Sequence, residues 1–215
     1  ISSHLELRDG NDQILSGYGW IFPLGGDQVN IGVGTLATAR HPASVHLRSL
    51  LQHYVEQRRG EFDLRGEVAG VWSALLPMGG AVSGVSGSNW LLVGDAAGCV
   101  NPLNGEGIDY ALETGRLAAD VMADEPGDLT EAWPALLTEH YGAAFSIARR
   151  LAGLLTVPGL LPTFGPWGMR SRTLMTIALR LMGNLITPAD ADAIAGLWRV
   201  AGRWSTAMDT RPPFR

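Results

Sequence analysis

The stretch Asn89–Leu112, NWLLVGDAAGCVNPLNGEGIDYAL, carries the strongest fold signal in the chain. The apolar run Trp90 to Val93 predicts a buried strand, and Gly94-Asp95 follows it directly. A loop of small residues and a proline-containing turn come next. Gly105-Glu106-Gly107-Ile108 then begins a helix that we expect to run from about Glu106 to Asp124. The sequence therefore predicts a strand–loop–helix unit.

Each part of this unit has a use in binding a long, hydroxyl-bearing and phosphorylated redox cofactor. The carboxylate of Asp95 can accept hydrogen bonds from sugar-like hydroxyls. Small neighbours at 96–98 let a ligand lie against the backbone. A helix that begins at Gly105–Gly107 presents unpaired N–H groups and a positive dipole end to an electron-rich ligand.

The arrangement resembles the second FAD motif of flavoproteins built like p-hydroxybenzoate hydroxylase. In that motif the Gly-Asp carboxylate holds the ribityl chain, and a P-x-x-G-x-G turn lies at the pyrimidine edge of the isoalloxazine. The N-P-x-x-G-E-G-I version, Asn101 to Ile108 here, is more similar to the geranylgeranyl reductase family than to the hydroxylases. The resemblance implies these FAD-binding residues: Asp95, Pro102, Gly105, Gly107 and Ile108.

A second run, Tyr18-Gly-Trp-Ile-Phe-Pro23, resembles the Y-x-W-x-F-P signature of the same family, where the strand lines the substrate cavity. Tyr18, Trp20 and Phe22 are two residues apart, so they share one face of a strand. They could form an apolar wall for an isoprenoid chain or an aromatic head group, or an ordinary aromatic core stripe. The two signatures occur in the order expected of the family, which favours substrate binding.

Strand-like and helix-like segments follow one another in an order typical of an α+β protein. Residues 1–35 alternate as strands, with turns at 10–12 and 25–27. Later segments are predicted as a helix at 42–59, a strand at 67–76, a helix from the break at 126–128 to about Leu155 with Pro134 in its first turn, a loop at 157–168, and helices at 171–185 and 188–204.

We interpret this organisation as the C-terminal half of a p-hydroxybenzoate hydroxylase-like FAD-binding fold. We expect an antiparallel substrate-cavity sheet with one helix at 1–88, the FAD-contacting strand–loop–helix at 89–126 and a helical region at 127–215. In the resembling family a phosphate-binding βαβ unit opens a protein about twice this length. No such unit is evident here, so the isolated chain could be inactive.

One glycine pattern imitates a dinucleotide fingerprint. Ile31–Ala37 contains G-x-G-x-x-A directly after a strand. The fingerprint requires a helix at the last glycine, but Pro42 disfavours helix at His41, and the helix that follows leads to Arg58-Arg59 instead of an acid-tipped strand. We therefore expect a glycine-rich strand end that packs near a ligand or another strand.

Bulk properties exclude several function classes. The net charge of −5 argues against nucleic acid, and one cysteine excludes an internal disulfide. The histidines show no metal-ligand spacing, so we expect no metal site. No run of eighteen apolar residues and no signal peptide is evident. We expect a cytoplasmic protein that contacts the cytoplasmic face of the membrane peripherally.

Three further features have two interpretations each. Cys99 could act in redox chemistry or simply pack. Glu106 could supply a carboxylate near the cofactor or compensate the helix dipole. The apolar residues of 174–185, interspersed with Arg170, Arg172 and Arg180, could form an amphipathic membrane surface or dock onto the protein's own sheet.

The resemblance implies an FAD-dependent reductase that saturates isoprenoid double bonds. Reduced flavin would deliver hydride to one alkene carbon while a proton reaches the other. The composition favours a polyprenyl quinone side chain, as in menaquinone, over geranylgeranyl-chlorophyll or archaeal-type lipids. Two alternatives remain: a flavin-dependent monooxygenase or halogenase of the same fold, and a non-catalytic lipid-binding module that uses the aromatic cavity without flavin.

Overall fold

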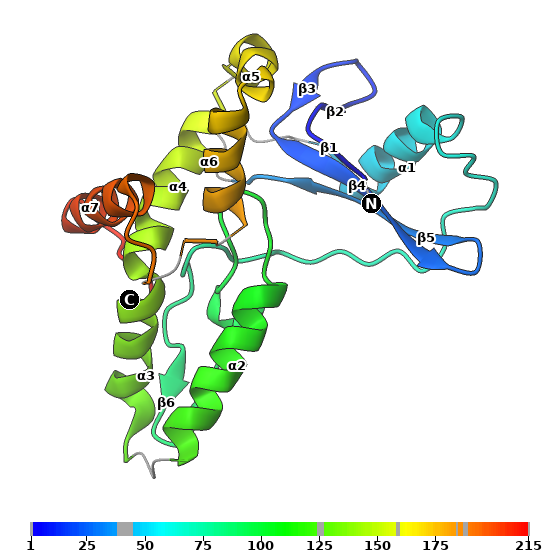
Figure 1. The fold of residues 1–215 in the computed structure, drawn as a ribbon. Helices are drawn as coiled ribbons and strands as arrows, with labels where there is room; N and C mark the ends of the chain where they lie inside the picture. Colours follow the sequence, from blue (N-terminus) through cyan, green and yellow to red (C-terminus); the bar gives the residue numbers. More distant parts are fainter. Residues whose placement is uncertain are drawn as a thin grey trace. The chain divides into compact units, whose positions relative to one another are not determined.

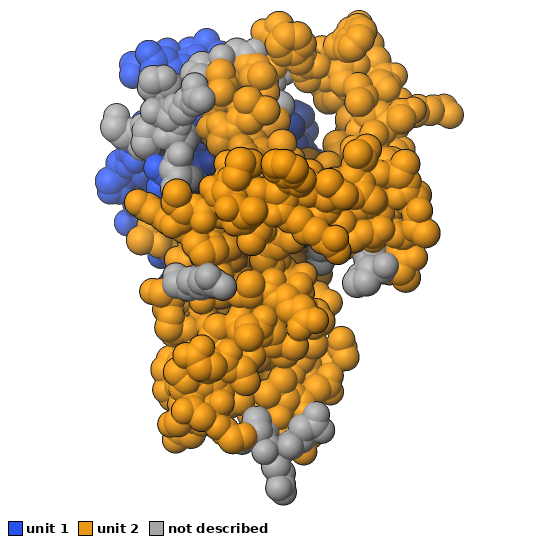
Figure 2. All heavy atoms as spheres, turned by 90° about the vertical axis from the view of Figure 1, so that its left-hand side faces the viewer, with its two compact units in different colours: residues 1–74 blue, residues 75–215 orange. Residues whose placement is uncertain are grey.

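Most strand residues lie in the first third of the chain and most helical residues in the last two thirds, which confirms the predicted α+β class (Figure 1). The structure is a computed structural model that describes residues 2–37, 45–123, 127–157, 160–183, 185–186 and 189–214. The chain divides into two units, Ile1–Ala74 and Leu75–Arg215, coloured blue and orange in Figure 2. No helix among the described residues is both long and apolar enough to span a bilayer.

The first unit contains two antiparallel sheets. Its strands are β1 Ser2–His4, β2 Leu7–Arg8, β3 Ile14–Leu15, β4 Gly17–Gly25 and β5 Gln28–Thr35. β4 is the central strand of the order β1-β4-β5, and β2 pairs with β3. The turns fall at the predicted Gly10–Asp12 and Gly25–Asp27, so the predicted strands and turns of residues 1–35 are confirmed.

Helix α1, Leu47–Arg58, covers one face of the larger sheet. Ile21 of β4 packs in a buried cluster with Leu50 and Tyr54 of α1 and with Leu7. This confirms the predicted helix from Leu47 onward, while residues 42–44 of the prediction lie outside the described residues. The core of the unit therefore lies on the Ile21 face of β4.

The strand predicted at Glu67–Leu76 is wrong. These residues form no strand, and no described strand pairs with them. Trp72 and Leu75 are each 92% exposed. A strand needs a hydrogen-bonded partner as well as apolar residues, and this segment has no partner in the described part of the chain.

The second unit begins with a short hairpin and continues into helices. Its elements are β6 Ser86–Gly87, β7 Trp90–Leu91, the 3₁₀ turn η1 Gly94–Ala97, α2 Ile108–Ala123, α3 Leu129–Leu137, the π-helical turn η2 Thr138–Gly142, α4 Ala143–Leu155, α5 Leu160–Arg170, α6 Arg172–Met182 and α7 Ala193–Ala207. In its core, Trp133 of α3 and Phe145 of α4 pack in one buried cluster with Tyr110 of α2 and with Cys99.

The buried strand predicted at Trp90–Val93 is shorter and less buried than expected. Only Trp90 and Leu91 pair in β7, and Trp90 is 48% exposed. The carbonyl of Leu92 accepts a hydrogen bond from the indole N–H of Trp133, 2.9 Å away. The N–H of Leu92 still donates to the carbonyl of Val85 at 2.8 Å, so Leu92 links the hairpin to helix α3.

The predicted helix from the 126–128 break to Leu155 is confirmed as α3, η2 and α4 in succession, beginning at Leu129. Asp128 caps it by accepting a hydrogen bond from the N–H of Thr130. Pro134 lies in the interior of α3, so its predicted place in the first turn is wrong. A proline there leaves the carbonyl of Thr130 without its helical donor. The hydroxyl of Ser86 lies 3.4 Å from that carbonyl and compensates in part.

The loop predicted at Val157–Gly168 is also wrong, because α5 occupies most of it; residues 158 and 159 lie outside the described residues. Pro162 falls in the first turn of α5, where a missing N–H costs little, and Pro166 frees one carbonyl of an exposed helix. The predicted helix at 171–185 is confirmed as α6, capped by Ser171. The predicted helix at 188–204 is confirmed as α7. This helix begins later than predicted, at Ala193, because Asp192 caps it. Residue 188 lies outside the described residues.

Candidate functional site

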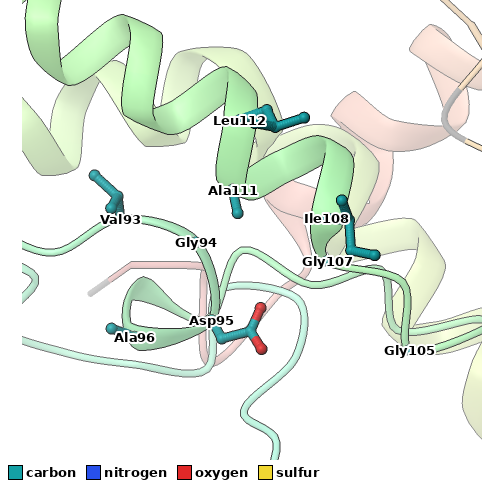
Figure 3. A pocket seen from close by; sticks show the side chains of 9 residues that line it. All are labelled: Val93, Gly94, Asp95, Ala96, Gly105, Gly107, Ile108, Ala111 and Leu112. Carbon is teal, nitrogen blue, oxygen red and sulfur yellow. The ribbon is translucent and has the colours of Figure 1, made fainter. Parts of the chain in front are cut away.

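A pocket of about 670 Å³ lies between η1 and the start of α2 (Figure 3). Small and apolar residues surround one carboxylate in its wall. The lining residues are Val93, Gly94, Asp95, Ala96, Gly105, Gly107, Ile108, Ala111 and Leu112. Four of the five residues predicted to bind FAD line this pocket, and the fifth, Pro102, does not.

Asp95 is exposed at the second position of η1. Figure 3 shows its carboxylate directed away from Ala96, toward the segment that leads to Gly107. Within the part of the chain that the structure describes, this carboxylate has no hydrogen-bond or ion-pair partner. It is therefore available to accept hydrogen bonds from a ligand.

Gly107 brings the start of α2 close to Asp95. A Cβ atom at Gly107 would lie 2.6 Å from Oδ1 of Asp95 and 3.1 Å from Val100. The carbonyl of Gly107 accepts a hydrogen bond from the N–H of Ala111, so the helix begins directly after this glycine. Glycine has no side chain that could cap the first turn of the helix, and a helix N-terminus favours an electron-rich ligand beside the carboxylate.

Thr114 fixes the corner at which η1 begins. Its buried hydroxyl accepts a hydrogen bond from the N–H of Gly94 at 3.0 Å and donates to the carbonyl of Tyr110 at 2.7 Å. Gly94 has a φ of 54°, and a Cβ atom there would lie 2.9 Å from Ala111. The sequence analysis missed Thr114. Its only signal is a hydroxyl on the apolar face of a helix, where it tends to bond the carbonyl four residues earlier.

Two asparagines hold the loop that connects η1 to α2. The side-chain oxygen of Asn101 accepts from the N–H of Leu103, and that of Asn104 accepts from the N–H of Glu106, both at 2.9 Å. Both side-chain amides also donate to the carbonyl of Met182, at 2.9 and 2.7 Å. The sequence analysis missed both roles, although Asn-Pro and Asn-Gly are turn-forming dipeptides.

Pro102 and Gly105 shape this loop in different ways. Pro102 is buried, and a Cβ atom at Gly79 would lie 3.0 Å from its ring, so it packs the loop against the rest of the unit. Gly105 has a φ of 73°, a conformation that favours glycine, and its N–H donates to the carbonyl of Asn101 at 2.8 Å. The predicted motif residues therefore include both pocket-lining and supporting positions.

Helix α2 has two apolar faces. One carries Tyr110, Leu117 and Ala118 into the core, and the other presents Ile108 and Leu112 to the pocket. Ile108 is 77% exposed although it is a large apolar residue. The sequence analysis predicted Ile108 but missed Ala111 and Leu112, which the helical spacing of three and four residues could have identified.

Cys99 and Glu106, each of which had two interpretations, differ in their surroundings. Cys99 is fully buried in the core; its burial, with further contributions from the Asp95 and Glu113 charges, raises its pKa to about 12. A thiol in that state is protonated and unreactive at neutral pH, which favours the packing role. Glu106 is exposed and precedes α2, and the acidic residue in the first turn is Asp109. No group of three or more His, Cys, Asp or Glu side chains among the described residues is placed to hold a metal ion.

The aromatic residues of β4 form a continuous row in the first unit. Ring centroids are 5.8 Å apart for Tyr18 and Trp20 and 6.3 Å apart for Trp20 and Phe22. The row lies opposite the Ile21 face that packs against α1, and its members are only partly buried. Within this unit the row is therefore not part of the core, and the core-stripe interpretation is not supported.

The glycines of Ile31–Ala37 accommodate this row. Trp20 and Tyr18 pair across the ladder with Gly32 and Gly34 of β5. A Cβ atom at Gly32 would lie 2.1 Å from the indole of Trp20, whose N–H donates to Asn30 at 2.8 Å. β5 continues through Gly34 to Thr35, as expected of a glycine-rich strand end and not of a dinucleotide fingerprint. Residues 38–42, where the sequence analysis excluded a helix because of Pro42, lie outside the described residues.

Comparison with known proteins shows what the chain is similar to. Residues 5–71 match the family described as "Geranylgeranyl reductase catalytic domain". This match includes the aromatic row of β4 and the glycines of β5. It confirms the predicted resemblance to the geranylgeranyl reductases over this part of the chain.

The chain is also similar to particular enzymes. It is 61% identical over all of its 215 residues to "Menaquinone reductase" of Mycolicibacterium smegmatis, covering 53% of that protein. It is 59% identical over its whole length to "Menaquinone reductase" of Mycobacterium tuberculosis H37Rv, covering 52% of it. "Digeranylgeranylglycerophospholipid reductase 2" of Methanosphaera stadtmanae is 35% identical over 59% of the chain and 32% of that protein.

The chain thus spans about half the length of the menaquinone reductases that it matches. No solved structure matches it.

Proposed function

We propose that this chain is the C-terminal half of an FAD-dependent reductase that saturates a double bond in the polyprenyl side chain of menaquinone. The observation that carries the proposal is the unpartnered carboxylate of Asp95, which faces Gly107 at the start of α2. Whole-length similarity to menaquinone reductases favours this substrate over archaeal-type lipids, since the archaeal relative matches only part of the chain.

The pocket residues fit one section of FAD. Asp95 would accept hydrogen bonds from the ribityl hydroxyls, and the N–H groups at the start of α2 would bind the pyrimidine edge of the isoalloxazine. Gly105 and Gly107 permit the close backbone approach, and Ile108 and Leu112 offer apolar contact. Pro102, Asn101 and Asn104 hold the loop in this shape. When bound and reduced, FAD would supply the hydride for the alkene and would itself be oxidised.

The substrate would lie along the aromatic row of β4. Tyr18, Trp20 and Phe22 offer a partly exposed apolar surface of a kind that suits an isoprenoid chain. In functional terms the sheet of the first unit, within residues 1–74, would then form the substrate cavity, the strand–loop–helix of 89–126 would contact FAD, and 127–215 would be the helical region. Because the side chain of menaquinone is a lipid, we also propose that the protein works at the cytoplasmic face of the membrane.

The test uses the purified full-length protein. We expect flavin absorbance bands near roughly 370 and 450 nm. After reduction and incubation with menaquinone without oxygen, mass spectrometry should show a quinone heavier by one pair of hydrogen atoms. Absent flavin bands would favour a lipid-binding module. Oxygen-dependent NAD(P)H consumption with an oxygenated aromatic product and an unchanged side chain would favour a monooxygenase.

A further inference from the structure

Charge is distributed unevenly along this chain. Residues 140–189 contain no aspartate or glutamate, although the whole chain has a net charge of −5. Among the arginines of this region, Arg149 pairs with Asp209, and Arg180 pairs with Asp190 and Asp192. Arg170 and Arg172, where α5 ends and α6 begins, are exposed, and their guanidinium groups have no hydrogen-bond or ion-pair partner among the described residues. The junction of α5 and α6 is therefore a local cationic site on an acidic protein.

The same two helices expose large apolar side chains beside these cations. Trp167 is 75% exposed, and Phe164 and Met169 of α5 are also exposed. No residue of α6 is buried, and Leu174 and Leu179 face solvent. Figure 1 shows α5 at the outer end of α6. Together Phe164, Trp167, Met169, Arg170, Arg172, Leu174 and Leu179 form what we call the α5–α6 surface.

This combination of side chains fits the interface of an anionic bilayer. Tryptophan partitions into the headgroup region, apolar neighbours enter the acyl boundary, and arginines attract anionic headgroups. A symmetric contact with the same surface of a second copy would place Arg170 and Arg172 of both copies in one interface that contributes no acidic side chain, which like-charge repulsion opposes. The charge pattern therefore selects a lipid surface over a second copy of this chain.

The inner end of α6 is joined to the candidate cofactor loop. The carbonyl of Met182 accepts the side-chain amides of both Asn101 and Asn104. A surface formed by α5 and α6 is thus connected through one short helix to the loop that bears Gly105 and Gly107. Docking of α5 would fix the position of this loop relative to the lipid.

We propose that the α5–α6 surface docks the protein on an anionic bilayer and so holds the Asn101–Gly107 loop near the membrane that contains a polyprenyl substrate. The lipid contact stands on the exposed apolar and cationic side chains alone. Its role in substrate delivery rests on the proposed function.

The experiment is co-sedimentation of the full-length protein with phosphatidylcholine vesicles that do or do not contain phosphatidylglycerol. Arg170→Gln/Arg172→Gln should weaken binding to the anionic vesicles about fivefold per arginine and leave the weak binding to neutral vesicles unchanged. Trp167→Ser should weaken binding to both vesicle types, by about tenfold. The control is Trp204→Ser, which removes a similarly exposed tryptophan from α7 and should bind as the unchanged protein does.

Two companion measurements identify other occupants of the surface. A large fall in melting temperature for Trp167→Ser, with vesicle binding intact, would assign the surface to contact within the longer protein. If the unchanged protein were a dimer and Trp167→Ser eluted at half its molecular mass in size-exclusion chromatography, the α5–α6 surface would be assigned to contact with a second copy. Either result overturns the proposal, as does equal loss of binding in Trp167→Ser and Trp204→Ser.

Flavin absorbance, recorded on the same samples, separates this proposal from the proposed function. Retained flavin without vesicle binding contradicts only the docking surface. Vesicle binding by a protein that holds no flavin supports the docking surface and contradicts only the proposed function.

Discussion

Two Gly-x-Gly sequences in this chain serve different purposes. In β5, Gly32 and Gly34 leave room for the side chain of a neighbouring strand, because a Cβ atom at Gly32 would meet the ring of Trp20. In the loop before α2, Gly105 supplies a positive φ and Gly107 lets the backbone approach Asp95. The first pair makes room for an aromatic row, and the second exposes backbone N–H groups and a carboxylate. The structural role of a Gly-x-Gly sequence therefore depends on which atoms lie opposite the glycines.

The largest expected effect is at Gly107. Gly107→Ala adds a Cβ atom that collides with Oδ1 of Asp95, so the affinity of the full-length protein for FAD should fall roughly tenfold to a hundredfold. Gly115→Ala is the matched control in α2, because nothing lies within 4 Å of its Cβ position and its φ is not positive. It should retain FAD and be more stable by about 0.5–1 kcal/mol. Fluorescence titration measures the FAD affinity of both variants. Equal FAD affinities would show that Gly107 does not bring the backbone to the cofactor.

The next effect concerns the side chain opposite Gly32. Trp20→Ala should lower kcat/KM for a polyprenyl substrate about tenfold, because it removes the largest apolar surface of the aromatic row. FAD should remain bound, and the melting temperature should change by no more than about 2–4 °C, since the indole lies outside the core of the unit. Steady-state kinetics and calorimetry separate the two effects. An enzyme that melts far lower but turns over substrate normally would make the row structural.

A smaller effect distinguishes the two glycines of β5. Gly32→Ala should destabilise the protein by about 1–3 kcal/mol, since the indole of Trp20 must move. Gly34→Ala meets the same ring at an ordinary 3.8 Å and should change stability by less than about 0.5 kcal/mol. Denaturant unfolding monitors both variants. If Gly34→Ala lowered the free energy of unfolding as much as Gly32→Ala does, the space needed by the Trp20 ring would not explain why both positions are glycine.

The smallest expected effect on turnover is at Cys99, just before the second Gly-x-Gly loop. Cys99→Ala should keep turnover within about twofold, because the thiol packs in the core and takes no part in the chemistry. The pKa of Cys99 is raised to about 12, so at pH 8 a thiol reagent should label the folded protein at least about a hundredfold more slowly than the unfolded chain. Labelling of the folded protein should accelerate as the pH approaches 12. Rapid labelling of the folded protein at neutral pH would contradict the packing role and favour the redox interpretation of Cys99.

Sequence patterns predicted the elements whose signals are local. Alternation and turn residues located the strands of residues 1–35, and the break at 126–128 located the start of the helix that begins at Leu129. The failures have non-local causes. Residues 67–76 have strand composition but no partner strand among the described residues, and a partner strand is not visible in the local pattern. The helix α5 forms with Pro162 in its first turn and with Pro166 in its interior, where an exposed helix tolerates the freed carbonyl.

The candidate site divides in the same way. The spacing of Asp95, Gly105 and Gly107 identified residues that line one pocket. Thr114 could not be identified because its role depends on the N–H of Gly94, twenty residues earlier. The contacts of Asn101 and Asn104 with the carbonyl of Met182 depend on how α6 packs, which no local pattern encodes.

The most direct measurement of the central claim is titration of the full-length apoprotein with FAD, comparing Asp95→Ala with Asp120→Ala. Asp120 is an exposed carboxylate near the far end of α2, paired with Arg116, and serves as the matched control. We predict that Asp95→Ala weakens FAD binding roughly tenfold or more and that Asp120→Ala leaves it unchanged. Equal affinities for the unchanged protein and both variants would contradict the assignment of this pocket to FAD.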